Sequence, residues 1–292
     1  MAAATTTNNL RHDPRKLVGC LFNRAKKWWI ASLLCKVGSI AVGAINVLIF
    51  PDVKSGAVAV FLIYVFSEIA TWRSDSFKGT AESVLRKLDF KDAFGWDISL
   101  ADMADLVMNC PASIRRIIPP PEDSDNYFAS AENVGATRAI ENLQESSWWS
   151  KHVAKRMGHL CLAATIALVL FSIVVLLISI DTVRDFDRLS SIGRVVTSAL
   201  MLIFSLGLLR LTMGYYGFAK KAEQADQLTL KLFSAGCDQL EAVKAWHEYQ
   251  VARAASPPLP SWLWKWMNKD MNEAWEQYRR RQPAHCKEIK DS

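Results

Sequence analysis

Residues 160–180 form a run of twenty-one amino acids, LCLAATIALVLFSIVVLLISI, that contains no charged side chain. A helix rises about 1.5 Å per residue, so this run is long enough to cross the roughly 30 Å hydrocarbon layer of a bilayer. A soluble domain rarely leaves so long a stretch without a polar face. The run therefore predicts a transmembrane helix, with lipid as the solvent for part of the chain.

Three other apolar stretches complete a pattern of four segments that pair as two hairpins. Residues 30–50 contain one charge, Lys36, and residues 56–72 contain one charge, Glu68, with a short turn between them. Residues 195–209 carry no charge and return from the first run after a polar loop. These lengths predict an all-α membrane protein with four transmembrane helices as two hairpins and a helical cytoplasmic body.

The predicted hairpins divide the chain into five segments. These are a cytoplasmic N-terminal arm (1–29), transmembrane hairpin 1 (30–72), a cytoplasmic helical insert (73–157), transmembrane hairpin 2 (158–210) and cytoplasmic C-terminal helices (211–292). Short loops on the cytoplasmic side of a membrane carry an excess of Lys and Arg. The two hairpin loops hold four basic and four acidic residues, whereas the arm and the insert are rich in basic residues. Both termini and the insert are therefore predicted to be cytoplasmic.

Tryptophans support this orientation, because the amphipathic indole ring favours the membrane–water interface. Five of them lie at the predicted inner-leaflet ends of the membrane segments: Trp28, Trp29, Trp72, Trp148 and Trp149. We expect these side chains to mark the cytoplasmic boundary of the membrane.

Polar residues from the four segments are predicted to share one layer near the inner leaflet. Counted from the outer turns, Lys36, Glu68 and Arg210 lie roughly 21, 18 and 22 Å along their helices, and Thr165 has a similar depth. Charges at such depth cost at least about 2.5 kcal/mol unless they are paired or hydrated. Two interpretations follow. A Lys36–Glu68 ion pair locks one hairpin while Arg210 snorkels to the head groups, which is favoured, or a polar ring lines a water pathway in an oligomer.

No motif in the chain is typical of catalysis, because the histidines are isolated and no phosphate-binding glycine loop or GxSxG sequence is present. The sequence therefore predicts no enzyme, no cofactor and no metal site. Five basic residues are candidates for binding an anionic ligand: Arg115, Arg116, Lys151, Lys155 and Arg156. A solvated basic face is the more common reason for such residues. The net charge of +6 is attributed to anionic lipid rather than to a nucleic acid polymer.

The C-terminal stretch SWLWKWMNKDMNEAWEQYRRR predicts an amphipathic helix after the rigid sequence SPPLP. Trp262 and Trp266 lie four residues apart, so they share one helical face. The helix could lie on the inner membrane surface, or it could pack on the cytoplasmic helices. Packing is favoured because charged residues interrupt its apolar face.

Three sequence stretches resemble a known family. They are LRKLDFKDAFGWDISLADMADL (85–106), RAIENLQESSWWSKHVAKRM (138–157) and PSWLWKWMNKDMNEAWEQYRRR (260–281). Their order around four apolar segments is similar to that of the SMODS-associated four-transmembrane proteins, which are predicted pore-forming effectors of bacterial conflict systems. The resemblance extends from about residue 24 to residue 281, and residues 111–125 depart from it.

This resemblance implies an effector of antiphage defence in the bacterial inner membrane. Such a protein would oligomerise and form or open a pore, causing depolarisation and death of the infected cell. A cyclic oligonucleotide, or a sensor protein linked to a nucleotidyltransferase, would control the pore. The family offers no catalytic or ligand-binding residues that could be transferred to this chain. The alternatives are a housekeeping ion channel or transporter, and a non-conducting membrane scaffold.

Overall fold

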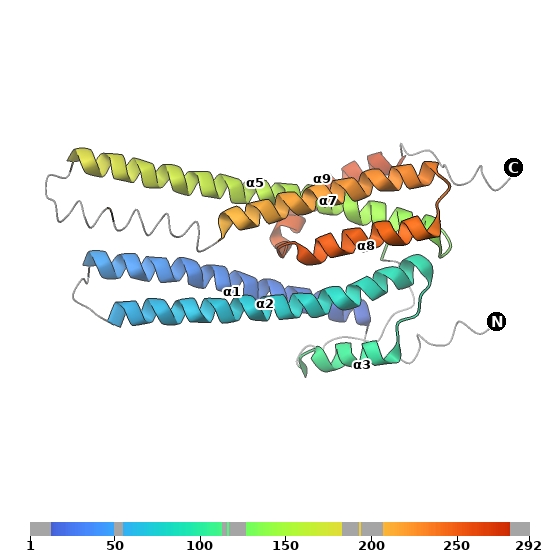
Figure 1. Ribbon diagram of the computed structural model, residues 1–292, viewed down its shortest axis with the longest axis horizontal. Coiled ribbons are helices and arrows are strands. Elements are labelled where there is room, and N and C mark those ends of the chain that lie inside the picture. Colours follow the sequence, from blue (N-terminus) through green and yellow to red (C-terminus); the bar gives the residue numbers. More distant parts are fainter. Residues whose placement is uncertain are drawn as a thin grey trace. The chain divides into compact units, whose positions relative to one another are not determined.

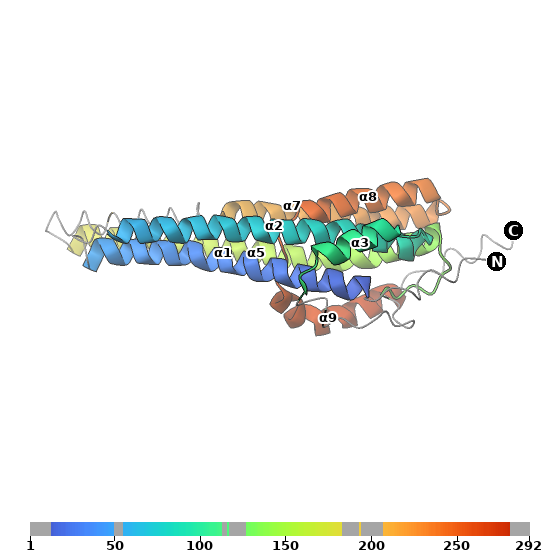
Figure 2. The ribbon, with the colours of Figure 1, turned by 90° about the horizontal axis from the view of Figure 1, so that it is seen from below.

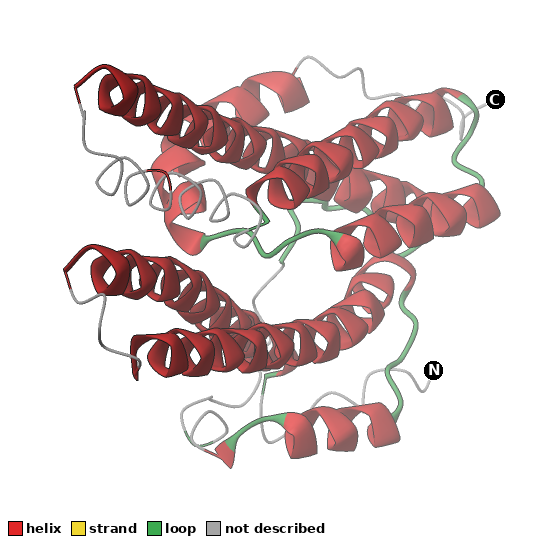
Figure 3. Cartoon of the chain, turned by 60° about the vertical axis from the view of Figure 1, so that its left-hand side comes forward, coloured by secondary structure: helices red, strands yellow, loops and turns green. Residues whose placement is uncertain are grey.

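The computed structural model describes residues 13–49, 55–112, 116, 127–182, 193 and 207–280. Within these residues the regular secondary structure is helical, and no strand is present (Figure 3). The helices are α1 (Pro14–Ile49), α2 (Ser55–Phe94), α3 (Leu100–Asn109), α5 (Ala136–Thr182), α7 (Leu208–Ser234), α8 (Gln239–Ala255) and α9 (Ser261–Arg280) (Figure 1). The predicted all-α class is confirmed.

The chain divides into two compact units. The body unit comprises Met1–Ala25, Ser76–Val153 and Phe218–Ser292, and the hairpin unit comprises Lys26–Asp75 and Ala154–Gly217. The arm, the insert and the C-terminal helices, which the sequence presents as three separate segments, therefore contribute to one unit. Most of the predicted hairpin residues belong to the other unit.

Helices α1 and α2 are antiparallel neighbours (Figures 1 and 2), and both are longer than the sequence suggests. Helix α1 begins at Pro14, where the Asp13 carboxylate accepts hydrogen bonds from the next backbone N–H groups, rather than near residue 30. Helix α2 continues past Trp72 to Phe94 and stops where Gly95 adopts a φ of +74°. Charged residues flank the apolar stretches of α1 and α2, but they do not end either helix. They mark where the helix passes from the hairpin unit into the body unit.

Helix α5 contains the charge-free run and is 47 residues long. Its stretch Ala136–Val174 is, among the described residues, the one helix long and apolar enough to cross a membrane, and its most apolar 18-residue window has a mean hydropathy of 2.2. Only 28% of that apolar window is buried, which distinguishes it from the core helix of a soluble protein. The predicted fourth segment, 195–209, lies outside the described residues except for its last three, and α7 begins at Leu208.

The body unit has an apolar core of the kind found in water-soluble proteins. Residues of α1, α2 and α3 meet in one cluster of buried side chains, in which Leu17, Leu21 and Leu106 are at most 1% exposed. Trp246 of α8 and Ile140 of α5 are fully buried elsewhere in the same unit. Each fully buried aliphatic or aromatic side chain contributes about 1.5–3 kcal/mol to folding through the hydrophobic effect.

Helix α9 packs on the body unit through one face. Leu263, Met271 and Trp275 are buried, and the Arg279 guanidinium donates a hydrogen bond of 3.0 Å to the carbonyl oxygen of Ala129. The packing predicted for this helix is therefore present. Residues 256–260, the SPPLP sequence, separate α9 from α8 as expected.

Candidate functional site

The predicted partners Lys36 and Glu68 meet between α1 and α2. The Lys36 Nζ atom lies 3.3 Å from Glu68 Oε1, in an ion pair within the hairpin unit. The Lys36 side chain is 15% exposed and that of Glu68 is 51% exposed. The antiparallel hairpin brings them together because both residues lie at a similar distance from the turn. This pair is what the first of the two interpretations predicts.

Small hydroxyl side chains fill the contact between the same two helices. The Ser32 hydroxyl lies 3.2 Å from the Ser67 hydroxyl and 2.7 Å from that of Thr71, and Ser67 also donates to the Ser32 carbonyl oxygen. Ser32 and Ser67 are 3% and 0% exposed. Small polar side chains let helix backbones approach closely, and this is how helices associate when lipid surrounds them.

Large apolar side chains of the hairpin unit face outward. On α2 they recur at intervals of three and four residues, which defines one exposed face of the helix. Its members are Val58, Phe61, Leu62, Val65, Phe66, Ile69 and Trp72. Helix α5 exposes Leu170, Phe171 and Leu177 while it buries Thr165 and Ser172. The unit thus buries small polar groups and exposes large apolar ones.

The other two residues of the predicted polar layer do not join the Lys36–Glu68 pair within the described part of the chain. Thr165 is buried, and its hydroxyl donates a 2.8 Å hydrogen bond to the Cys161 carbonyl oxygen on its own helix. Arg210 lies in the first turn of α7 and is exposed. The layer is therefore one ion pair, one satisfied threonine and one exposed guanidinium group.

The described candidates for anion binding belong to different units and have different surroundings. The Lys151 ammonium group is already engaged with the Asp226 carboxylate in an ion pair. Lys155 and Arg156 are exposed one turn further along α5, and Arg116 is exposed in the body unit. Arg115 lies outside the described residues. Of the five candidates, three remain accessible and are spread over both units.

The predicted interfacial tryptophans have different surroundings. Trp72 is 63% exposed at the end of the apolar face of α2, and Trp28, Trp29 and Trp149 are partly exposed. Trp148 is 6% exposed, because its ring packs in the body unit against Trp275 of α9 at a centroid distance of 5.2 Å and an interplanar angle of 50°. The same amphipathic ring suits a protein core as well as a membrane surface. Trp148 is therefore a core residue of the body unit rather than an exposed membrane marker.

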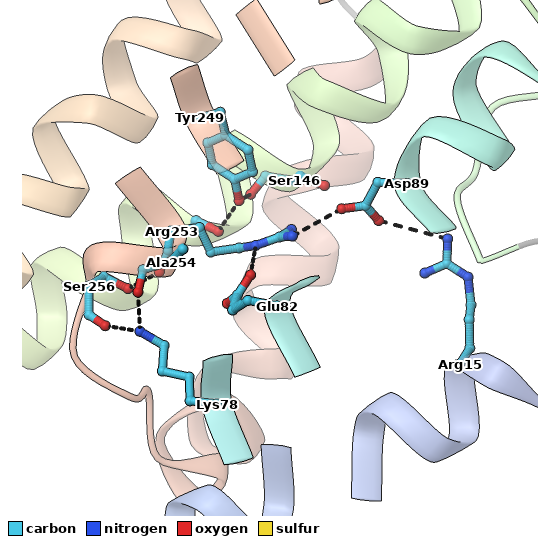
Figure 4. Close-up of polar contacts among 10 residues, drawn as sticks. Arg15, Lys78, Glu82, Asp89, Ser146, Tyr249, Arg253, Ala254 and Ser256 are labelled. Atoms are coloured by element: carbon cyan, nitrogen blue, oxygen red, sulfur yellow. Dashed lines mark hydrogen bonds and ion pairs between the residues drawn. The ribbon is translucent and has the colours of Figure 1, made fainter. Parts of the chain in front are cut away.

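A buried ionic network in the body unit was not foreseen in the sequence (Figure 4). The Arg253 guanidinium of α8 donates from Nε to Glu82 Oε2 at 3.0 Å and from Nη2 to Asp89 Oδ2 at 3.1 Å. Arg15 of α1 approaches the other oxygen of Asp89 at 3.8 Å and also pairs with Asp92. The side chains of Asp89 and Glu82 are 2% and 6% exposed. We call these five residues the Arg253 network.

Two further contacts near the Arg253 network join α8 to α2 and to α5. The Lys78 ammonium donates to the carbonyl oxygens of Ala254 and Ser256, where a cation complements the negative end of the helix dipole (Figure 4). The Tyr249 hydroxyl donates to the Ser146 carbonyl oxygen of α5 at 3.0 Å. The network and these contacts together connect four helices: α1, α2, α5 and α8.

The electrostatic balance of the Arg253 network indicates a structural role. Burial works against the charged form of Arg253, but the carboxylates of Asp89 and Glu82 outweigh it and raise the pKa of Arg253. Burial also raises the pKa of Tyr249 to about 12, so its hydroxyl remains a donor at neutral pH. Two guanidinium groups face three carboxylates, which leaves no excess of positive charge for an anionic ligand.

Within the described residues, two carboxamides of the body unit find no hydrogen-bond partner in the protein. Asn142 of α5 and Gln250 of α8 are both 0% exposed, and neither the oxygen nor the nitrogen of either side chain is paired. Each such group costs about 1–3 kcal/mol relative to a paired one. They lie on the two helices joined by Tyr249, and by the Trp246 indole N–H, which donates to the Ala139 carbonyl oxygen at 2.6 Å.

Comparisons of the chain with protein-family models, curated proteins and solved structures return no match. Within the described residues, no group of three or more His, Cys, Asp or Glu side chains is arranged to hold a metal ion. The likeness to the SMODS-associated four-transmembrane proteins remains a prediction based on three sequence stretches.

Proposed function

We propose that this chain is a multi-pass protein of the bacterial inner membrane that oligomerises to form or open a pore. In this proposal four helices cross the membrane as two hairpins, and both termini and the body unit are cytoplasmic. The apolar run of α5 and the exposed apolar face of α2 support lipid contact for both hairpins. The biological role would be abortive infection, in which depolarisation kills an infected cell.

The observation that carries the proposal is the half-exposed carboxylate of Glu68. It lies beside the exposed apolar side chains Val65 and Ile69, where lipid would leave a charged oxygen without hydration. An ionised group in that position costs several kcal/mol unless water or another protein covers it (about 3 kcal/mol on insertion scales). A second copy of the chain, or the water of a pore between copies, would provide that cover.

Control of the pore is assigned to the predicted cytoplasmic insert, residues 73–157. Arg116, Lys155 and Arg156 are the exposed members of the predicted anion-binding set, so a cyclic oligonucleotide or a partner sensor would act through them or near them. A ligand that binds the open arrangement more tightly shifts the equilibrium toward it.

The deciding experiment measures membrane potential in bacteria after induced expression. We expect depolarisation and growth arrest for the natural sequence, and a clear reduction for Glu68→Ala and for Glu68→Gln. Asp75→Ala is the matched control, since Asp75 is an exposed carboxylate of the same helix beyond the apolar face. Equal effects of the Glu68 and Asp75 variants would remove Glu68 from the mechanism.

A non-conducting scaffold is the second candidate, because an ion pair and a hydroxyl-filled contact are also what a permanently closed hairpin would need. The two functions differ in reconstituted vesicles. A pore releases a trapped dye or conducts ions when the stimulus is present, and a scaffold does neither. A correctly inserted protein that stays harmless with cyclic di- and trinucleotides would favour the scaffold.

A further inference from the structure

The first half of α9 exposes three tryptophans within five residues. Trp262, Trp264 and Trp266 are 53%, 48% and 58% exposed, although α9 as a whole packs on the body unit. Leu263, between them, is fully buried. The helix is therefore anchored at this end while the three tryptophans around the anchor stay about half exposed. We call these three residues the α9 tryptophans.

Two of the three tryptophans share one face of the helix with both lysines of this half. Successive residues of a helix are about 100° apart, so Trp262 and Trp266 differ by about 40°. Lys265 and Lys269 lie within about 60° of Trp262, whereas Trp264 lies on another side. A face that carries tryptophan and lysine side chains is typical of a helix on a membrane surface, whereas a protein groove receives an apolar face.

The charges of this half-helix point to an anionic surface. Residues 261–269 include Lys265 and Lys269, both exposed, and no acidic residue. The acidic residues of α9 begin at Asp270. Lysines near a membrane gain about 1 kcal/mol each from anionic lipids, and indole rings favour the head-group region.

We propose that two of the α9 tryptophans, Trp262 and Trp266, insert into the head-group layer of an anionic membrane, with Lys265 and Lys269 contacting lipid phosphates. The C-terminal half of α9 holds this site to the body unit through Met271 and Trp275. The body unit would thereby have a membrane contact of its own. This contact requires neither a pore nor an oligomer.

Photo-crosslinking of the full chain in lipid nanodiscs tests this site. p-Benzoylphenylalanine replaces Trp266 in one variant and Trp96 in the control, since Trp96 is a 48% exposed tryptophan of the body unit outside α9. Mass spectrometry then identifies what each position has joined. We expect lipid adducts at position 266 that exceed those at position 96 several-fold. Adducts with protein alone, or equal lipid adducts at both positions, would overturn the proposal.

Lipid composition and two lysine variants test the electrostatic part. Nanodiscs of phosphatidylglycerol mixed with phosphatidylcholine should give several-fold more adduct at position 266 than phosphatidylcholine alone. Lys265→Gln combined with Lys269→Gln should remove that excess while the thermal unfolding midpoint stays unchanged. Equal adduct yields in both lipid mixtures, with and without the two lysines, would overturn the role of charge.

Discussion

The body unit and the hairpin unit bury opposite kinds of side chain. In the body unit Leu17, Leu21 and Trp246 are fully buried. In the hairpin unit Ser67 is fully buried, while Phe61 and Leu62 are 63% and 60% exposed. The same long helices contribute to both units, so helix formation itself does not distinguish them. The two units therefore differ in which side chains they bury, and this difference is what the proposed lipid contact of the hairpin unit predicts.

The two units also treat buried charge differently. In the Arg253 network the carboxylates of Glu82 and Asp89 are buried, and guanidinium groups neutralise their charge. The hairpin unit has the Lys36–Glu68 pair, with one partner half exposed. The buried and balanced Arg253 network indicates a structural role. The half-exposed Glu68 carboxylate indicates a surface that contacts another molecule.

The largest effect should come from Arg253→Met. This change leaves Asp89 and Glu82 buried without their main partner, which we expect to lower the free energy of unfolding by about 3–5 kcal/mol. Thermal unfolding in detergent measures it. Lys244→Met, which removes only an exposed pair with Glu241, is the control and should change little. A stable Arg253→Met protein would show that the network does not hold the body unit together.

Paired leucine truncations compare the two units directly. Leu21→Ala removes a fully buried side chain of the body unit, and we expect a loss of about 2–5 kcal/mol. Leu62→Ala removes an exposed side chain of the hairpin unit, where detergent or lipid replaces the lost contact, so the unfolding midpoint should barely move. Similar losses for both variants, measured in the same micelles, would contradict the inverted burial.

The smallest effect is a pH dependence through Tyr249. Its pKa is raised from 10.0 to about 12, so its contribution is fully present below pH 10 and is lost as the pH rises through 12. Two pKa units correspond to about 2.7 kcal/mol at most. Urea unfolding across this range should give a steeper loss for the natural chain than for Tyr249→Phe. If the free energy of unfolding depends on pH equally in the natural chain and in Tyr249→Phe, the buried hydroxyl does not cause this pH dependence.

Local features of the fold could be predicted from the sequence. The charge-free run marks α5. Serine is a common N-cap residue, and the Ser99 hydroxyl accepts from the Asp102 N–H at 3.1 Å at the start of α3. The Lys36–Glu68 pair follows from counting residues on either side of a short turn. Each of these depends on neighbours along the chain or on one hairpin.

Long-range pairings could not be predicted in the same way. Arg253 and Asp89 are 164 residues apart, and their contact depends on how the helices of the body unit pack. One signal was present in the sequence, because Glu82, Asp89 and Asp92 recur at intervals of seven and three residues and so share a face of α2. Their basic partners on other helices cannot be identified from that spacing.

The unpaired amides of Asn142 and Gln250 make the exclusion of water unfavourable in part of the α5–α8 contact. Each amide offers two donor hydrogens and an acceptor oxygen, and one entering water molecule can satisfy several of these at once. Hydration of the amides would thus offset part of the free energy needed to separate α5 and α8 at Asn142 and Gln250. Separating the helices at Trp246 has no such compensation. The contact between α5 and α8 is therefore weaker at these two amides than at Trp246, where the indole N–H is paired.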